Sequence, residues 1–244
     1  MNKQLQRYWE IDFLRGIAVI MMIVYHVLFD LDFLQIVNFP LQTLWFRLFL
    51  YPIGTLFLLL VGVSLVLSYN RYYQKHKIVP PFTKYLKRGV ILFSLALLIT
   101  AITWVYPHEG FIVFGVIHCI GLSIILSYFF ISKPEISLMT GVVIIIIGIY
   151  FMNISVSNPY VFWLGLKTPF FYTLDYFPLL PWFGVVLIGI FIGQRISPFL
   201  EKRYRVDQKI PRFFKAITVL GKNSLIVYIL HQPILYAILF FLFV

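Results

Sequence analysis

The chain has 244 residues, of which 61% are apolar, 19% are aromatic and only 12% are charged, and its mean hydropathy is +0.92. This composition excludes an ordinary soluble domain and indicates a protein that lies in a membrane. The formal net charge of +11 does not indicate nucleic acid binding, because no nucleic-acid module accompanies it and the positive-inside rule accounts for the excess of Lys and Arg. We therefore expect no nucleic acid partner.

Apolar stretches along the chain are long enough to cross about 30 Å of hydrocarbon as helices. They predict an all-α fold, a polytopic membrane helix bundle of about seven transmembrane helices that forms a single domain, 1–244. Because most Lys and Arg fall in the same set of connections, we expect a cytoplasmic N-terminus and a multi-pass protein of the cell membrane. The stretches lie at roughly 11–31, 48–69, 89–106, 111–131, 137–153, 179–196 and 216–243.

The first apolar stretch carries four polar residues that are costly to place in hydrocarbon. Asp12, Arg15, His26 and Asp30 fall within one stripe of about 60° around a helix axis, because successive residues are about 100° apart. Asp30 follows His26 by one turn, where a carboxylate can fix the tautomer of the imidazole and stabilise its protonated form. The stripe predicts a functional face on this helix.

The inner end of the stripe allows two interpretations. Asp12 and Arg15 are three residues apart, so they can simply pair, with Arg15 reaching toward the membrane surface. In the functional interpretation, Arg15 faces an anionic group that enters from the cytoplasm. The polar residues that open the last helix and the dipole of that helix would assist it. Those residues are Lys222, Asn223 and Ser224.

Two connections predicted on the inner side are strongly basic, Arg71–Arg88 and Arg195–Lys215. They would meet either the anionic head groups of membrane lipids or a polyanionic cofactor. In the cofactor interpretation, Arg88 at the end of the first connection joins Asp12 and Arg15 in the cofactor-binding set.

Two further histidines are predicted at a membrane depth similar to that of His26. At about 1.5 Å per residue, His26 and His231 each lie about 22 Å from the predicted inner ends of their helices, and His118 lies about 11 Å from an outer end. Two glycines near His118 would let a ligand or a neighbouring backbone approach. His231 shares a helix face with Ser224 and Tyr228, which forms either a site or a polar seam between helices.

The predicted outer connection, from about Asn153 to Pro181, is long, aromatic and rich in proline. Proline prevents a regular helix but fixes a defined path. The segment is therefore either a cap over an outer cavity or an interfacial aromatic belt. Asp175 in this segment and Tyr228 on the last helix are our candidates for contacting a substrate.

The spacing R-x4-D-x2-RG-x9-H, formed by Arg7, Asp12, Arg15, Gly16 and His26, resembles the opening of the heparan-α-glucosaminide N-acetyltransferase-like family of membrane enzymes, particularly its short prokaryotic members. The distance from Arg15 to His26 is also similar to that in bacterial membrane O-acyltransferases that modify envelope polysaccharides. Other segments extend the resemblance to that N-acetyltransferase family over nearly the whole chain. They are FGVIHCIG (114–121), DYFPLLPWFGVVLIGIFIG (175–193) and LGKNSLIVYILHQP (220–233).

The resemblance implies a transmembrane acyltransferase that takes an acyl group, expected to be acetyl, from cytosolic acyl-CoA. The enzyme would pass this group to a sugar or glycoconjugate acceptor on the outer side. The family's first-helix histidine and arginine correspond to His26 and Arg15. The resemblance does not include the additional helices and the lumenal domain of the large animal enzyme. The identity of the acceptor therefore stays open, as does the choice between His26 and another histidine for the catalytic step.

In the mechanism that we predict, the inner basic residues hold the CoA phosphates and the pantetheine arm extends along the polar stripe. His26 either deprotonates the acceptor hydroxyl or amine or carries the acyl group covalently, while Asp30 orients it. Another polar side chain donates a hydrogen bond to the developing oxyanion. The candidates for that donor are His118, Ser224, Tyr228 and His231.

Two other functions stay open at this point. A transporter or flippase for a sugar or lipid also needs a polar seam through a helix bundle, and two histidines in the membrane are also typical of a haem protein. The spacing of the histidines does not support a zinc site, and we assign no metal ligand. The expected partners are acyl-CoA, the acceptor and membrane lipids, and a homo-oligomer is compatible with the sequence.

Overall fold

The structure is a computed structural model that describes residues 8–40, 43–203 and 210–243. These residues form helices joined by turns, with two isolated bridges, so the predicted all-α class is confirmed. Arg7, which opens the sequence motif, lies outside the described residues, as does part of the second basic connection. The α-helices are α1 (Trp9–Phe33), α2 (Leu44–His76), α3 (Phe82–Val105), α4 (Val116–Ser127), α5 (Pro134–Phe151), α6 (Leu179–Arg203), α7 (Lys215–Lys222) and α8 (Ser224–Phe243).

In the described part of the chain, six helices are long and apolar enough to cross a membrane, one fewer than the sequence predicts. They belong to α1, α2, α3, α5, α6 and α8. The stretch 111–131 holds only α4, which has 12 residues. Its first residues do not join the helix because their backbone pairs with the outer connection, where the N–H of Phe177 donates to the carbonyl of Phe114 at 3.0 Å.

The prediction of one helix over 216–243 is wrong, because the chain changes direction at Asn223 between α7 and α8. The backbone N–H of Asn223 donates to the carbonyl of Leu220 at 3.1 Å, and its side-chain amide donates to the carbonyl of Val219 at 3.0 Å. Its own carbonyl accepts from the N–H of Val227 at 3.0 Å. Asn223 thus closes one helix and opens the next, in the manner expected of a capping residue.

The chain forms two compact units, which we describe separately. Residues 1–60 and 200–244 make the first unit, and residues 61–199 make the second. Helices α2 and α6 contribute residues to both. The family resemblance runs through both units, and the prediction of a single domain stays a prediction.

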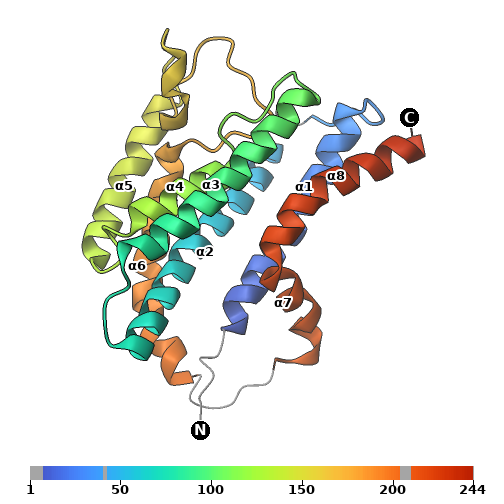
Figure 1. The fold of residues 1–244 in the computed structure, drawn as a ribbon. Coiled ribbons are helices and arrows are strands. Elements are labelled where there is room, and N and C mark those ends of the chain that lie inside the picture. Colours follow the sequence, from blue (N-terminus) through green and yellow to red (C-terminus); the bar gives the residue numbers. More distant parts are fainter. Residues whose placement is uncertain (1–7, 41–42, 204–209, 244) are drawn as a thin grey trace. The chain divides into compact units, whose positions relative to one another are not determined.

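In the first unit, α1 packs against α7 and α8 (Figure 1). Two glycines let α1 and α7 approach closely. A Cβ atom on Gly221 would lie 2.6 Å from the backbone nitrogen of Gly16, and one on Gly16 would lie 2.7 Å from Cγ2 of Ile217. Small residues of this kind are typical of close helix packing in membranes. Stacking of Trp9 on Phe214, with ring centroids 6.0 Å apart, supports the same contact.

In the second unit, close contacts between helices are also made at glycines. A Cβ on Gly193 of α6 would lie 3.0 Å from the Cα of Val63 on α2, and one on Gly141 of α5 would lie 2.9 Å from the carbonyl oxygen of Gly184 on α6. Helix α3 meets α4 where Gly89 lies against Gly121. These contacts bring α2, α5 and α6 together and pair α3 with α4.

Candidate functional site

The polar stripe predicted on the first helix faces protein rather than lipid. Helix α1 is continuous through all four residues, and Asp12 and Asp30 are 2% and 1% exposed. Asp12 lies beside α7, and Asp30 lies beside α8. The stripe therefore lines the contact of α1 with the two C-terminal helices, which is the environment that makes buried polar groups tolerable in a membrane protein.

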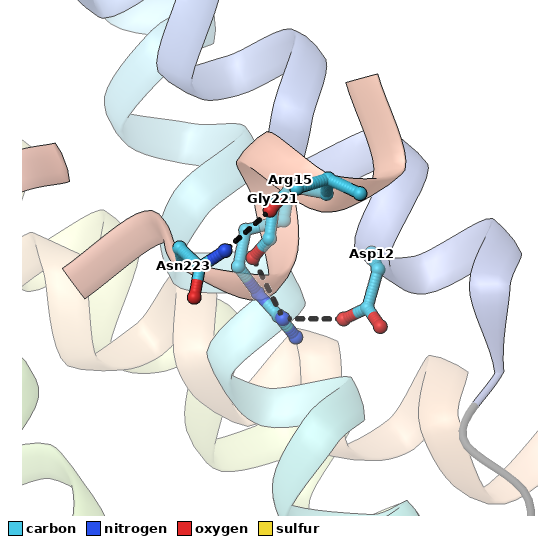
Figure 2. A network of polar contacts seen from close by, with 5 residues as sticks. Asp12, Arg15, Gly221 and Asn223 are labelled. Carbon is cyan, nitrogen blue, oxygen red and sulfur yellow. Dashed lines mark hydrogen bonds and ion pairs between the residues drawn. The ribbon is translucent and has the colours of Figure 1, made fainter. Parts of the chain in front are cut away.

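At the inner end of the stripe, Arg15 joins α1 to the end of α7. Figure 2 shows its guanidinium beside the Asp12 carboxylate and the Gly221 carbonyl, with nitrogen–oxygen distances of 2.7 Å and 3.4 Å. The last carbonyls of a helix have no partner within the helix, and a cation there also interacts favourably with the helix dipole. The predicted pairing of Asp12 with Arg15 is thus present.

The other residues predicted around Arg15 lie at the junction of α7 and α8. Lys222 and Asn223 are exposed and Ser224 is half-buried. The amide of Asn223 is used in capping α7 (Figure 2). The structure therefore brings Asp12, Arg15 and this junction together, and their assignment to cofactor binding stays a prediction.

A pair of histidines lies where α1 passes α8. The rings of His26 and His231 have centroids 4.6 Å apart, and His231 is 7% exposed. Nδ1 of His231 lies 2.6 Å from the backbone carbonyl oxygen of Tyr228. Because a carbonyl can only accept, Nδ1 carries the proton and Nε2 of a neutral ring is left with a lone pair. This Nε2 and Nδ1 of His26 are buried and have no hydrogen-bond partner among the described residues.

Next to the histidines, Gln232 of α8 binds Asp30 of α1. The Nε2 of Gln232 donates to Oδ1 of Asp30 at 2.6 Å. The second carboxylate oxygen of Asp30 and the amide oxygen of Gln232 are buried and have no hydrogen-bond partner in the described part of the chain. Sequence reasoning missed Gln232, although an amide directly after His231 in an otherwise apolar helix is a visible signal. We call His26, Asp30, His231 and Gln232 the α1–α8 polar cluster.

His118 and Asp175 lie together in the second unit, at the first turn of α4. Oδ2 of Asp175 accepts from the backbone N–H of Val116 at 3.0 Å. Nδ1 of His118 accepts from the N–H of Gly115 at 3.2 Å, and its Nε2 lies 3.3 Å from Oγ1 of Thr100. Both ring nitrogens of His118 are therefore engaged, whereas each ring of the histidine pair has a buried nitrogen without a partner among the described residues. Arg88, on α3, is exposed. The predicted site roles of these residues stay predictions.

The contact of His231 with His26 agrees with the similar depth predicted for these two residues, but the predicted distances of His118 and His231 from the ends of their helices have to be corrected. His118 is in the first turn of α4, because that helix begins at Val116 and not near Phe111. His231 lies about 10 Å along α8, counted from Ser224. The predicted depths require helices that run without interruption from 111 and from 216. The chain instead breaks before α4 and before α8, so both helices begin later than predicted.

The outer connection is ordered by backbone and ring contacts. It contains a short 3-10 helix, Pro159–Leu164. The hydroxyl of Tyr176 donates to the carbonyl of Phe162 at 2.7 Å, and Nζ of Lys167 lies 4.7 Å from the centroid of the Tyr176 ring. Burial raises the pKa of the Tyr176 phenol, so this hydroxyl stays protonated as a donor.

These observations define the class of the protein as a polytopic membrane helix protein in which α1 and α8 enclose a cluster of histidine, carboxyl and amide groups. Residues 7–233 match the family model described as heparan-alpha-glucosaminide N-acetyltransferase, catalytic. The chain therefore belongs to this family of membrane-bound acetyltransferases, which use acetyl-CoA as the donor. The resemblance found in the sequence is confirmed. No curated protein and no solved structure matches the chain.

Proposed function

We propose that the protein is a transmembrane acetyltransferase. It would take the acetyl group of acetyl-CoA on the cytoplasmic side of the cell membrane and transfer it to the amine or hydroxyl of a sugar or glycoconjugate on the outer side. Membership of the acetyltransferase family supports the reaction type. The observation that carries the proposal for the site is the α1–α8 polar cluster, with two histidines 4.6 Å apart.

The chemistry of this cluster favours an acceptor that is rich in hydrogen-bond donors. Three of its buried atoms without partners among the described residues have lone pairs to offer: Nε2 of His231, Oε1 of Gln232 and Oδ2 of Asp30. A buried polar atom without a partner costs about 1–3 kcal/mol. A sugar or amino sugar brings several O–H or N–H groups and would satisfy these atoms. We assign Tyr228, whose ring centroid lies 5.5 Å from that of His231, to the same acceptor region.

The inner end of α1 supplies groups that suit acetyl-CoA. CoA carries several phosphates, and Arg15 and the exposed Lys222 place two cations at the junction of α7 and α8. Arg15 and His26 are 11 residues apart, which corresponds to about 16 Å along α1. An extended pantetheine arm can bridge that distance.

The proposal is tested with purified protein in detergent, where no compartments exist. Acetyl-CoA labelled in the acetyl group is supplied with glucosamine as an amine acceptor or methyl glucoside as a hydroxyl acceptor. We expect labelled acetylated sugar and release of CoA thiol. A transporter or flippase would form neither product. A folded protein that releases no CoA thiol with either acceptor would overturn the proposal.

A further inference from the structure

We propose that His231, and not His26, is the general base of the α1–α8 polar cluster, with His26 beside it as a hydrogen-bond donor to the oxygen of the acetyl group. This inference rests on the proposed function and assigns the roles within that site. It reverses the order expected from the sequence, where His26 and its neighbour Asp30 form the more obvious pair.

A hydrogen bond to the backbone fixes the tautomer of His231. Its Nδ1 donates to the carbonyl oxygen of Tyr228 at 2.6 Å, a short and therefore well-formed bond. The lone pair of the ring is consequently on Nε2, where a proton can be accepted. When the ring takes up that proton, the carbonyl continues to accept from Nδ1 and stabilises the positive charge.

The surroundings of Nε2 of His231 leave this nitrogen available to accept a proton. This nitrogen is buried, has no partner among the described residues, and belongs to a residue that is 7% exposed. The ring of His26 lies beside it at an angle of 59°. The hydrogen bond between Gln232 and Asp30 fixes α8 against α1 one residue further along the chain. Nε2 of His231 thus has a fixed position but makes no hydrogen bond that stabilises the fold.

His26 differs from His231 in its hydrogen bonding. Its buried Nδ1 has no partner in the described part of the chain, so no carbonyl or carboxyl contact selects its tautomer or stabilises a positive charge there. A second positive charge beside a protonated His231 would also be repelled. His26 therefore stays neutral, and its one N–H can donate to the oxygen of the acetyl group as negative charge develops.

In the proposed reaction, the acetyl group moves from the thioester sulfur to the acceptor while His231 carries the proton in the opposite direction. The acceptor nitrogen or oxygen attacks the thioester carbonyl carbon and forms a new N–C or O–C bond, while its proton moves to Nε2 of His231. The C–S bond then breaks, and the proton on Nε2 passes to the departing sulfur. Acetyl-CoA and the acceptor become the acetylated acceptor and free CoA thiol, and His231 returns to its starting form.

The test compares His231→Asn with His26→Asn. The Asn amide takes roughly the place of Nδ1, so His231→Asn keeps a donor for the Tyr228 carbonyl but loses the base. We expect its kcat to fall about 100-fold to 10,000-fold without loss of thermal stability. His108→Asn is the matched control, because Nδ1 of this exposed histidine also lies against a backbone carbonyl, that of Trp104, at 2.7 Å. Its positive φ of 71° suits Asn, and its kcat should not change.

The pH dependence of kcat separates a base from a structural residue. Without a base, the remaining activity of His231→Asn should rise about tenfold per pH unit, because only acceptor that is already deprotonated reacts. The other titratable groups at the site, Tyr25, His26 and Asp30 on α1 and Tyr228 on α8, remain in this variant. His26→Asn should keep the wild-type profile at a lower rate.

Two results would overturn this assignment: wild-type kcat in His231→Asn, or the tenfold rise appearing in His26→Asn instead. A wild-type protein that forms no product would show a different failure, that of the proposed function. The tautomer is then still measurable by 15N NMR of histidine-labelled protein. Nδ1 of His108 also lies against a backbone carbonyl, so two rings protonated at Nδ1 are expected in the wild type. One of these signals should vanish in His231→Asn and the other in His108→Asn. If the signal that is lost in His231→Asn does not come from a ring protonated at Nδ1, the assignment is also refuted.

Discussion

Gln232 is the hydrogen-bond partner of a buried carboxyl group. Its amide donates to Asp30, which is 1% exposed, and removing one partner of a buried pair leaves the other unsatisfied. We expect Gln232→Met, which has a similar size, to lower the free energy of unfolding by about 1–3 kcal/mol. Reversible unfolding in detergent measures this quantity.

The control for Gln232 is a double variant. Asp30→Leu combined with Gln232→Met removes both polar partners, so it should recover part of the stability that the single change loses. If Gln232→Met alone is as stable as the wild type, the hydrogen bond has no role in holding α1 to α8.

His118 makes a second prediction at this scale, because both of its ring nitrogens are bound within its own unit. His118→Leu leaves the buried N–H of Gly115 without its acceptor, which should cost about 1–3 kcal/mol of unfolding free energy. The kcat of the fraction that is folded should be close to that of the wild type. A stable His118→Leu protein without activity would instead support the catalytic role predicted from the sequence.

Only some residues of the α1–α8 polar cluster can be predicted from the sequence. His26 and Asp30 could be predicted because polar groups are costly in an apolar helix and their angular spacing places them on one face. Their partners on α8 could not be predicted, because spacing within one helix does not show which residue of another helix lies opposite. Gln232 and the Tyr228 carbonyl were therefore found only in the structure.

At the scale of elements, the contact of α1 with α7 depends on two glycines. A Cβ on Gly221 would lie 2.6 Å from the backbone nitrogen of Gly16, and backbone cannot move aside as a side chain can. We expect Gly221→Ala to lower the free energy of unfolding by about 1–3 kcal/mol, as overpacking does. Val219→Ala on the exposed side of α7 is the matched control. Equal stability of the two variants would contradict this packing.

The helix breaks explain why some elements could not be predicted. Hydropathy identified every long apolar stretch, because burial in hydrocarbon requires about 20 apolar residues. It does not detect a cap such as Asn223, whose hydrogen bonds end one helix and begin the next within an apolar stretch. It also cannot detect that Phe114 pairs with the outer connection instead of entering α4.

At the scale of the whole molecule, six helices that can cross a membrane and membership of an acetyltransferase family combine into one claim. The donor and the acceptor would be on opposite sides of the bilayer, and the protein would pass the acetyl group between them. The basic connections favour a cytoplasmic N-terminus and thus a donor site at the inner end of α1.

The most direct test of this claim uses sealed vesicles that contain the purified protein, with glucosamine trapped inside and labelled acetyl-CoA added outside. We predict that N-acetylglucosamine accumulates in the interior and CoA thiol accumulates outside, with the vesicles remaining sealed. Acetylated sugar that forms only after detergent opens the vesicles, or that never forms, would contradict transfer across the membrane.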